Sequence, residues 1–161
     1  MKTWYLISVY LHILCATLWV GGMLFLVLVL LPAIKNHPER RNLLGSVGIK
    51  FRLAGWIALI VLLLTGLFNM HYRGVSLADL TANSYGKLFL TKLILFCITL
   101  IISAYHDFYI GPRSIKMMAD THAANARQTK RYVKTARIVG ELNMLLALIA
   151  VALGILIVRG W

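Results

Sequence analysis

Two histidines and one lysine stand out because they lie within, or at the edge of, long apolar stretches. His12, His71 and Lys92 are ionisable, and such a side chain is costly in a membrane unless something binds it. Two imidazoles from different helices of a bundle suit an axially ligated haem, so His12 and His71 are candidate metal ligands. Lys92 and Arg73 would then receive the haem propionates. The simpler alternative is that His12 bonds to a carbonyl or to water, and that His71 is an interfacial loop residue.

The segment around His12 has a face that suits a flat ligand. Cys15, Trp19, Gly22 and Met23 follow His12 at helical spacing and would lie on one side of a helix. A glycine at position 22 would let another backbone or a planar macrocycle come close. We therefore expect Trp19 and Gly22 to border the haem.

A second polar stripe is formed by Lys92, Thr99, Ser103 and His106, which fall on roughly one face of a helix. Lipid offers these groups no hydrogen-bond partner, so the stripe is predicted to face the bundle interior. His106 could be a second ligand or a proton-handling group. It could equally be a structural partner of Glu141.

Copper is the alternative metal, because Cu(I) favours thioether and thiolate ligands. Met23 and Met70 are isolated in the sequence and do not form a methionine-rich motif. Cys15 and Cys97 lie inside apolar stretches, with no metal-binding spacing and no disulfide pattern.

The elements that must position these residues are transmembrane helices. Hydrophobic residues make up 60% of the 161-residue chain, and its mean hydropathy is +0.80. Each of four apolar stretches is long enough to cross a hydrocarbon core of about 30 Å as a helix. They cover about residues 5–31, 53–70, 88–110 and 138–158. The prediction is an all-α, integral membrane four-helix bundle of one domain, residues 1–161, with lipid as its surroundings.

The net charge of +12 is explained by topology and does not indicate a nucleic-acid partner. Lysine and arginine concentrate in the first loop, residues 32–52, and in the third, residues 107–137, while the second loop has few. By the positive-inside rule the first and third loops are cytoplasmic, and both termini are non-cytoplasmic. We expect a multi-pass protein of the cell inner (plasma) membrane.

This topology predicts two polar levels. His12, His71 and Lys92 would lie near the non-cytoplasmic side, with His12 about 10 Å inside its span and His71 at a matching depth. His106 would lie about 20 Å deeper than Lys92. Four helices leave little room to enclose a porphyrin, so a homodimer is expected.

The sequence also resembles a known family, through short motifs spread over most of the chain. The motifs are His12-Ile13-Leu14 with Leu18 to Gly22, Gly86-Lys87-Leu88 through Thr91-Lys92-Leu93, Tyr105 to Phe108 with Gly111-Pro112-Arg113, and Arg137 to Asn143. They resemble the CopD-like copper-resistance membrane proteins and the related HemJ-type protoporphyrinogen oxidases.

The resemblance implies a four-helix membrane fold, with haem or tetrapyrrole chemistry in one branch and copper handling in the other. The HemJ type carries a first-helix histidine, matched by His12, and a third-helix lysine, matched by Lys92. Those oxidases usually have an Asn-Glu-Pro type sequence in the fourth helix, where this chain reads Gly140-Glu141-Leu142-Asn143. The leading hypothesis is a membrane b-type haem protein that carries haem or passes electrons. The rivals are a protoporphyrinogen oxidase-like enzyme and a copper-handling protein.

Overall fold

Four long helical spans make up nearly all of the computed structural model, which describes residues 2–76, 78–119 and 126–159. The elements in chain order are α1 (Lys2–Phe25), the π-helical turn η1 (Leu26–Leu30), α2 (Leu31–Ala33), α3 (Arg40–Tyr72), α4 (Asp79–Ala82), α5 (Ser84–Tyr105), the π-helical turn η2 (His106–Ile110), α6 (Gly111–Ala119) and α7 (Ala126–Arg159). Four spans are long and apolar enough to cross a membrane: Lys2–Ala33, Arg40–Tyr72, Ser84–Met118 and Ala126–Arg159. The predicted all-α four-helix membrane fold is confirmed.

The helices run further than the apolar stretches in the sequence. Spans of 32 to 35 residues measure about 48–53 Å, well beyond a hydrocarbon core of about 30 Å. The first loop was predicted over residues 32–52, but the chain is helical again from Arg40. The third loop was predicted over residues 107–137, but η2, α6 and α7 run through most of this range, and residues 120–125 lie outside the described part of the chain.

Two of these spans widen into a π-helical turn just before a proline. Turn η1 lies before Pro32, and turn η2 lies before Pro112. A proline ring clashes with the carbonyl four residues earlier and donates no hydrogen bond, so the helix loosens there. Turn η2 begins at His106 and contains Asp107, which makes it part of the site described below.

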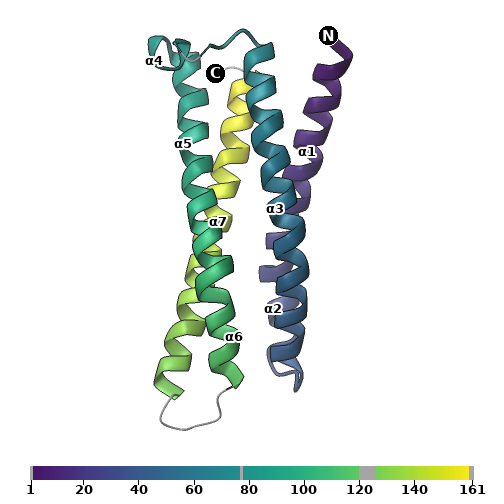
Figure 1. Ribbon diagram of the computed structural model, residues 1–161, viewed down its shortest axis with the longest axis vertical. Coiled ribbons are helices and arrows are strands. Elements are labelled where there is room, and N and C mark those ends of the chain that lie inside the picture. The colour runs from purple at the N-terminus through teal and green to yellow at the C-terminus, as the bar shows by residue number, and fades with distance from the viewer. Residues whose placement is uncertain (1, 77, 120–125, 160–161) are drawn as a thin grey trace.

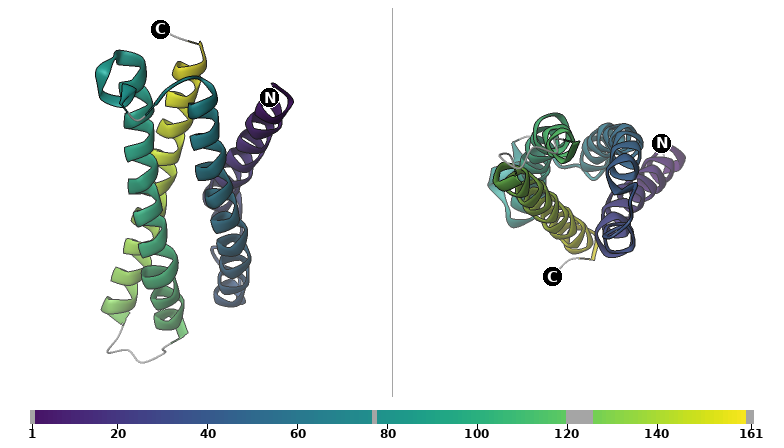
Figure 2. Two further views of the ribbon diagram at one scale, coloured as in Figure 1. Left: turned by 45° about the horizontal axis from the view of Figure 1, so that its top comes forward. Right: turned by 90° about the horizontal axis from the view of Figure 1, so that it is seen from below.

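The spans pack as two pairs, α1 with α3 and α5 with α7 (Figure 1). The pairs meet where α1 contacts α7 and where α3 contacts α6 (Figure 2). The start of α1 and the end of α7 lie at the same end of the bundle, called here the terminal end. The opposite end carries the first and third loops and most of the lysines and arginines, and is called the basic end.

A small apolar core holds the pairs together. Its buried members are Trp19, Val20, Met23, Ala58, Leu59, Leu62 and Ala147. Large apolar side chains elsewhere are exposed, such as Leu28, Ile101 and Val158, as expected of helix faces that meet lipid. The polar stripe of α5 faces inward as predicted, since Thr99 is 1% exposed and Ser103 is 4% exposed.

Candidate functional site

The imidazole of His12 is fixed by a hydrogen bond across the α1–α3 interface. Its Nδ1 atom lies 2.7 Å from Oγ1 of Thr65. The Thr65 hydroxyl donates its own hydrogen to the carbonyl of Val61, 2.6 Å away, so it can only accept from the ring. The tautomer that satisfies both contacts has its hydrogen on Nδ1 of His12 and a lone pair on Nε2, which is a form of histidine that can bind a metal ion.

Glycine and lysine surround this ring. A methyl group at Gly66 would lie 3.5 Å from Cε1 of His12, so the glycine leaves room for the imidazole. Lys92 of α5 is close enough for its charge to act on His12. Its Nζ atom would lie 2.9 Å from a methyl group at Gly154 of α7, which places the ammonium against that backbone. All four long helices thus contribute residues around His12 and Lys92, in the terminal half of the bundle.

His71 does not join this group. It is exposed in the last turn of α3, where it lines a surface groove of about 580 Å³ with Trp4, Phe68 and Tyr72. His12 is level with Thr65, and six further residues along α3 place His71 about 9 Å closer to the terminal end. The predicted depth match between the two histidines is therefore not what the bundle shows.

Arg73 lies at the terminal end of the bundle and joins the helices there through hydrogen bonds. Its guanidinium donates to the Tyr5 hydroxyl at 3.2 Å, the Tyr85 hydroxyl at 2.9 Å and the carbonyl of Ile157 at 3.2 Å. The hydrogen bonds to Tyr85 and Tyr5 raise the pKa of Arg73 above its usual value. Tyr5 also stacks on Tyr72 with ring centroids 4.2 Å apart. One side chain thus links α3 to the other three long helices.

Trp19 lies in the core, and Gly22 is packed against Phe51. Trp19 is 6% exposed, and its Cδ1 atom would lie 3.5 Å from a methyl group at Gly55. The ring of Phe51 occupies the space over Gly22 so fully that a methyl group there would overlap it. The gap predicted beside Gly22 for a planar ligand is wrong, because Phe51 from α3 fills it.

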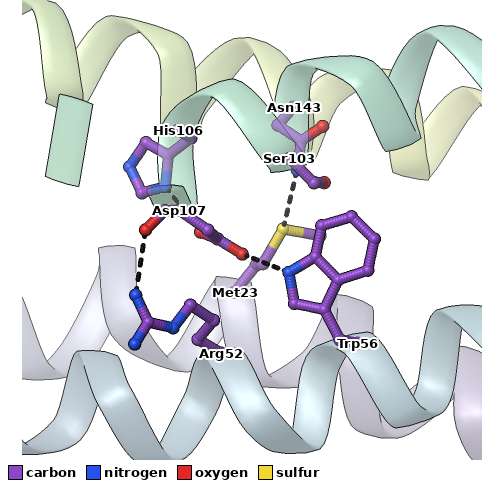
Figure 3. Close-up of polar contacts among 7 residues, drawn as sticks. All are labelled: Met23, Arg52, Trp56, Ser103, His106, Asp107 and Asn143. Carbon is purple, nitrogen blue, oxygen red and sulfur yellow. Dashed lines mark hydrogen bonds and ion pairs between the residues drawn. The ribbon is translucent and has the colours of Figure 1, made fainter. Parts of the chain in front are cut away.

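A second polar cluster lies toward the basic end (Figure 3). The carboxylate of Asp107 accepts from the indole Nε1 of Trp56 at 3.1 Å and pairs with Nδ1 of His106 at 2.9 Å. The guanidinium of Arg52 donates to the backbone carbonyl of Asp107 at 3.1 Å. A methyl group at Gly140 would lie 3.7 Å from Nε2 of His106. Helix α3 is thus bonded to turn η2, and His106 lies against α7.

Asn143, also drawn in Figure 3, is a buried polar residue near this cluster. Its amide donates to the Ser103 hydroxyl at 2.9 Å and contacts the Met23 sulfur at 3.9 Å. The sequence left Glu141 open as a structural partner of His106. Glu141 pairs with Arg137 instead, at 2.7 Å on an exposed face. Sequence reasoning also missed Thr65 and Trp56, whose only signal was a polar atom inside an apolar stretch.

No group of three or more histidine, cysteine, aspartate or glutamate side chains comes together as a metal site among the described residues. Cys15 is half-buried and Cys97 is exposed, and both are free thiols.

Comparison with known proteins identifies the family of this chain. The family model for copper resistance protein D matches residues 46–157, which is more than half of the chain. An uncharacterized protein of Aquifex aeolicus (strain VF5) is 33% identical over 154 residues, covering 94% of each chain. No solved structure matches. The chain belongs to the copper resistance protein D family.

Proposed function

We propose that this protein handles copper within the membrane and that Nε2 of His12 binds the ion. Family membership supports copper as the cargo. Imidazole nitrogen is a common copper ligand, and His12 offers one inside the bundle with its lone pair free.

The observation that carries this proposal is the hydrogen bond between His12 and Thr65. Histidines that bind metals usually donate their other ring N–H to a fixed acceptor, which sets both the tautomer and the ring orientation. The Thr65 hydroxyl is such an acceptor, because the Val61 carbonyl takes its only hydrogen.

One imidazole does not complete a copper site. The described chain holds no group of three or more histidine, cysteine, aspartate or glutamate side chains that would complete a site at His12. We extend the proposal to a homodimer, in which a second copy supplies ligands, because a copper ion in transit needs at least two donors.

Binding of haem b is the second candidate function, and the observation that favours it is that Lys92 is close enough to His12 for its charge to act on the ring. His12 would hold the iron of such a group, and Lys92 would offer a positive charge to a propionate. His71 would not join His12 as a ligand, because it is exposed and about 9 Å nearer the terminal end. Such a group would supply redox chemistry or be carried as cargo.

Metal analysis of detergent-purified protein tests the proposal. We expect about one copper ion per chain after exposure to copper and reduction, and little copper in His12→Ala. His37→Ala is the matched control, because His37 is exposed in the first loop, and it should keep full copper content. Full copper content in His12→Ala would contradict the proposal. An absorption band at about 410–430 nm together with iron would favour haem.

A further inference from the structure

A groove runs between α1 and α3 in the terminal half of the bundle. Its upper part is the space of about 580 Å³ bordered by Trp4, Phe68, His71 and Tyr72. A lower part of about 390 Å³ adjoins it, because Trp4 and Phe68 line both. The lower part is lined further by Ile7, Ser8, Leu11, Leu64 and Thr65. Trp4 and Leu64, on opposite walls, are 69% and 62% exposed, so the groove opens on the lipid-facing side of the bundle.

Contacts at both ends of the groove hold its two walls in place. At the terminal end, Tyr5 of α1 stacks on Tyr72 of α3, and Arg73 donates to the Tyr5 hydroxyl. At the lower end, the hydrogen bond between His12 and Thr65 ties α1 to α3 again. Helix α1 leans away from the other spans toward its N-terminus (Figure 2). The groove between the two ties is therefore a fixed feature of the folded bundle.

The hydroxyl of Ser8 is a hydrogen-bond donor on the wall of this groove. Ser8 is 8% exposed, and its hydroxyl oxygen has no hydrogen-bond partner among the described residues. A buried hydroxyl without a partner is uncommon in native proteins and calls for an explanation, such as a bound molecule. The other hydroxyl of the lower part, that of Thr65, is already engaged with His12 and the carbonyl of Val61. The groove thus fits a ligand that is apolar for most of its length and presents an acceptor to Ser8.

The depth of Ser8 indicates which acceptor this is. Trp4 and Tyr72 are aromatic residues at the terminal end, where such rings mark the level of the lipid headgroups. Ser8 follows Trp4 by four residues, so it lies about 6 Å further into the bundle. The headgroup layer on each side of a bilayer is about 5–8 Å thick. Ser8 therefore lies near the boundary with the hydrocarbon core, where the ester carbonyls of a phospholipid are found. His71 lines the upper part and makes no hydrogen bond within the described chain, so its ring N–H can donate to a phosphate.

We propose that this groove binds one membrane phospholipid. An acyl chain lies along the apolar walls, an ester carbonyl accepts from Ser8, and the phosphate accepts from His71. Both parts of the groove have volumes in the range of small-molecule sites. The lower end borders Thr65, so the bound lipid lies against the residue that holds His12. The lipid site itself does not require copper.

Native mass spectrometry of delipidated, detergent-purified protein tests this directly. A phosphatidylglycerol with ester linkages would be titrated beside its matched ether-linked form, which lacks the carbonyl oxygens. We expect saturable binding of one ester lipid per chain in the wild type, about three- to tenfold tighter than the ether lipid, the effect of one hydrogen bond. Ser8→Ala should bind the two lipids equally. Ser46→Ala is the matched control, because Ser46 is exposed on α3 toward the basic end, and it should keep the preference for the ester.

Leu11→Trp tests the position of the acyl chain. The larger side chain should fill the lower part of the groove and abolish the complex with one lipid, whereas Leu18→Trp, on an exposed face of α1 outside the groove, should bind as the wild type does. The proposal would be overturned by wild-type binding in Leu11→Trp, by an ester preference that survives in Ser8→Ala, or by the absence of saturable binding. Retention of a lipid-soluble quinone in place of a phospholipid would also overturn it. A protein that binds the lipid through Ser8 but no copper would contradict only the proposed function.

Discussion

Nδ1 of His12 and Oγ1 of Thr65 lie 2.7 Å apart, and this hydrogen bond fixes the ring of His12 against α3. Thr65 is buried, with only 9% of its surface exposed, and its hydrogen is directed to the Val61 carbonyl. The result is an imidazole held as an acceptor at Nε2 in the terminal half of the bundle.

Thr65→Val should weaken copper binding about 10–100-fold, because valine has nearly the same shape but cannot accept from Nδ1. Competition against a Cu(I) chelator would measure this loss. Thr65→Ser keeps the hydroxyl and should bind close to the wild type. Equal affinities for all three proteins would show that the hydrogen bond does not orient a ligand.

The helices and the inward stripe of α5 could be predicted from sequence, because length, hydropathy and the cost of polar atoms in lipid are local properties. The hydrogen bond between His12 and Thr65 could not be predicted, because it depends on how α1 and α3 are rotated and shifted relative to each other. The depth match with His71 failed for the same reason. It assumed that apolar stretches begin and end at one level, whereas α1 begins at Lys2 and α3 continues to Tyr72.

Gly22→Ala should destabilise the protein, because the added methyl group would meet the ring of Phe51. Gly21→Ala is the matched control: nothing lies within 4 Å of its methyl position, and alanine favours a helix by up to about 1 kcal/mol. Melting temperatures in detergent should fall for the first variant and hold or rise for the second. The opposite order would mean that α1 and α3 pack differently around Gly22.

Trp56→Phe should lower the melting temperature by about 2–4 °C, because it removes the indole donor to Asp107 at a net cost of about 1 kcal/mol. Trp4→Phe changes an indole that is 69% exposed and should have little effect. Similar melting temperatures for both variants would argue against a bond between α3 and turn η2.

Arg73→Lys should loosen the terminal end, because a lysine lacks the planar set of donors that reaches Tyr5, Tyr85 and Ile157 together. Hydrogen exchange should then speed up in the first turn of α5 and the last turn of α7. Lys87→Met, also near the terminal end, serves as the control. Unchanged exchange in Arg73→Lys would mean that these hydrogen bonds do not hold the helices together.

The terminal end is predicted to face the non-cytoplasmic side, because the opposite end carries most of the lysines and arginines. The test replaces Cys15 and Cys97 with alanine and introduces a single cysteine at Ser76 or at Gln128, both exposed. A membrane-impermeant thiol reagent added to intact cells should label the cysteine at position 76 and not the one at position 128. The reverse pattern would invert the topology.

X-ray absorption at the copper edge of the loaded protein tests the central claim most directly, because it reports the atoms bound to the metal. We predict the multiple-scattering pattern of an imidazole in the wild type and in His37→Ala, and no imidazole pattern from the little copper that His12→Ala retains. A wild-type spectrum without imidazole, or an imidazole pattern that persists in His12→Ala, would contradict the proposal that His12 binds copper.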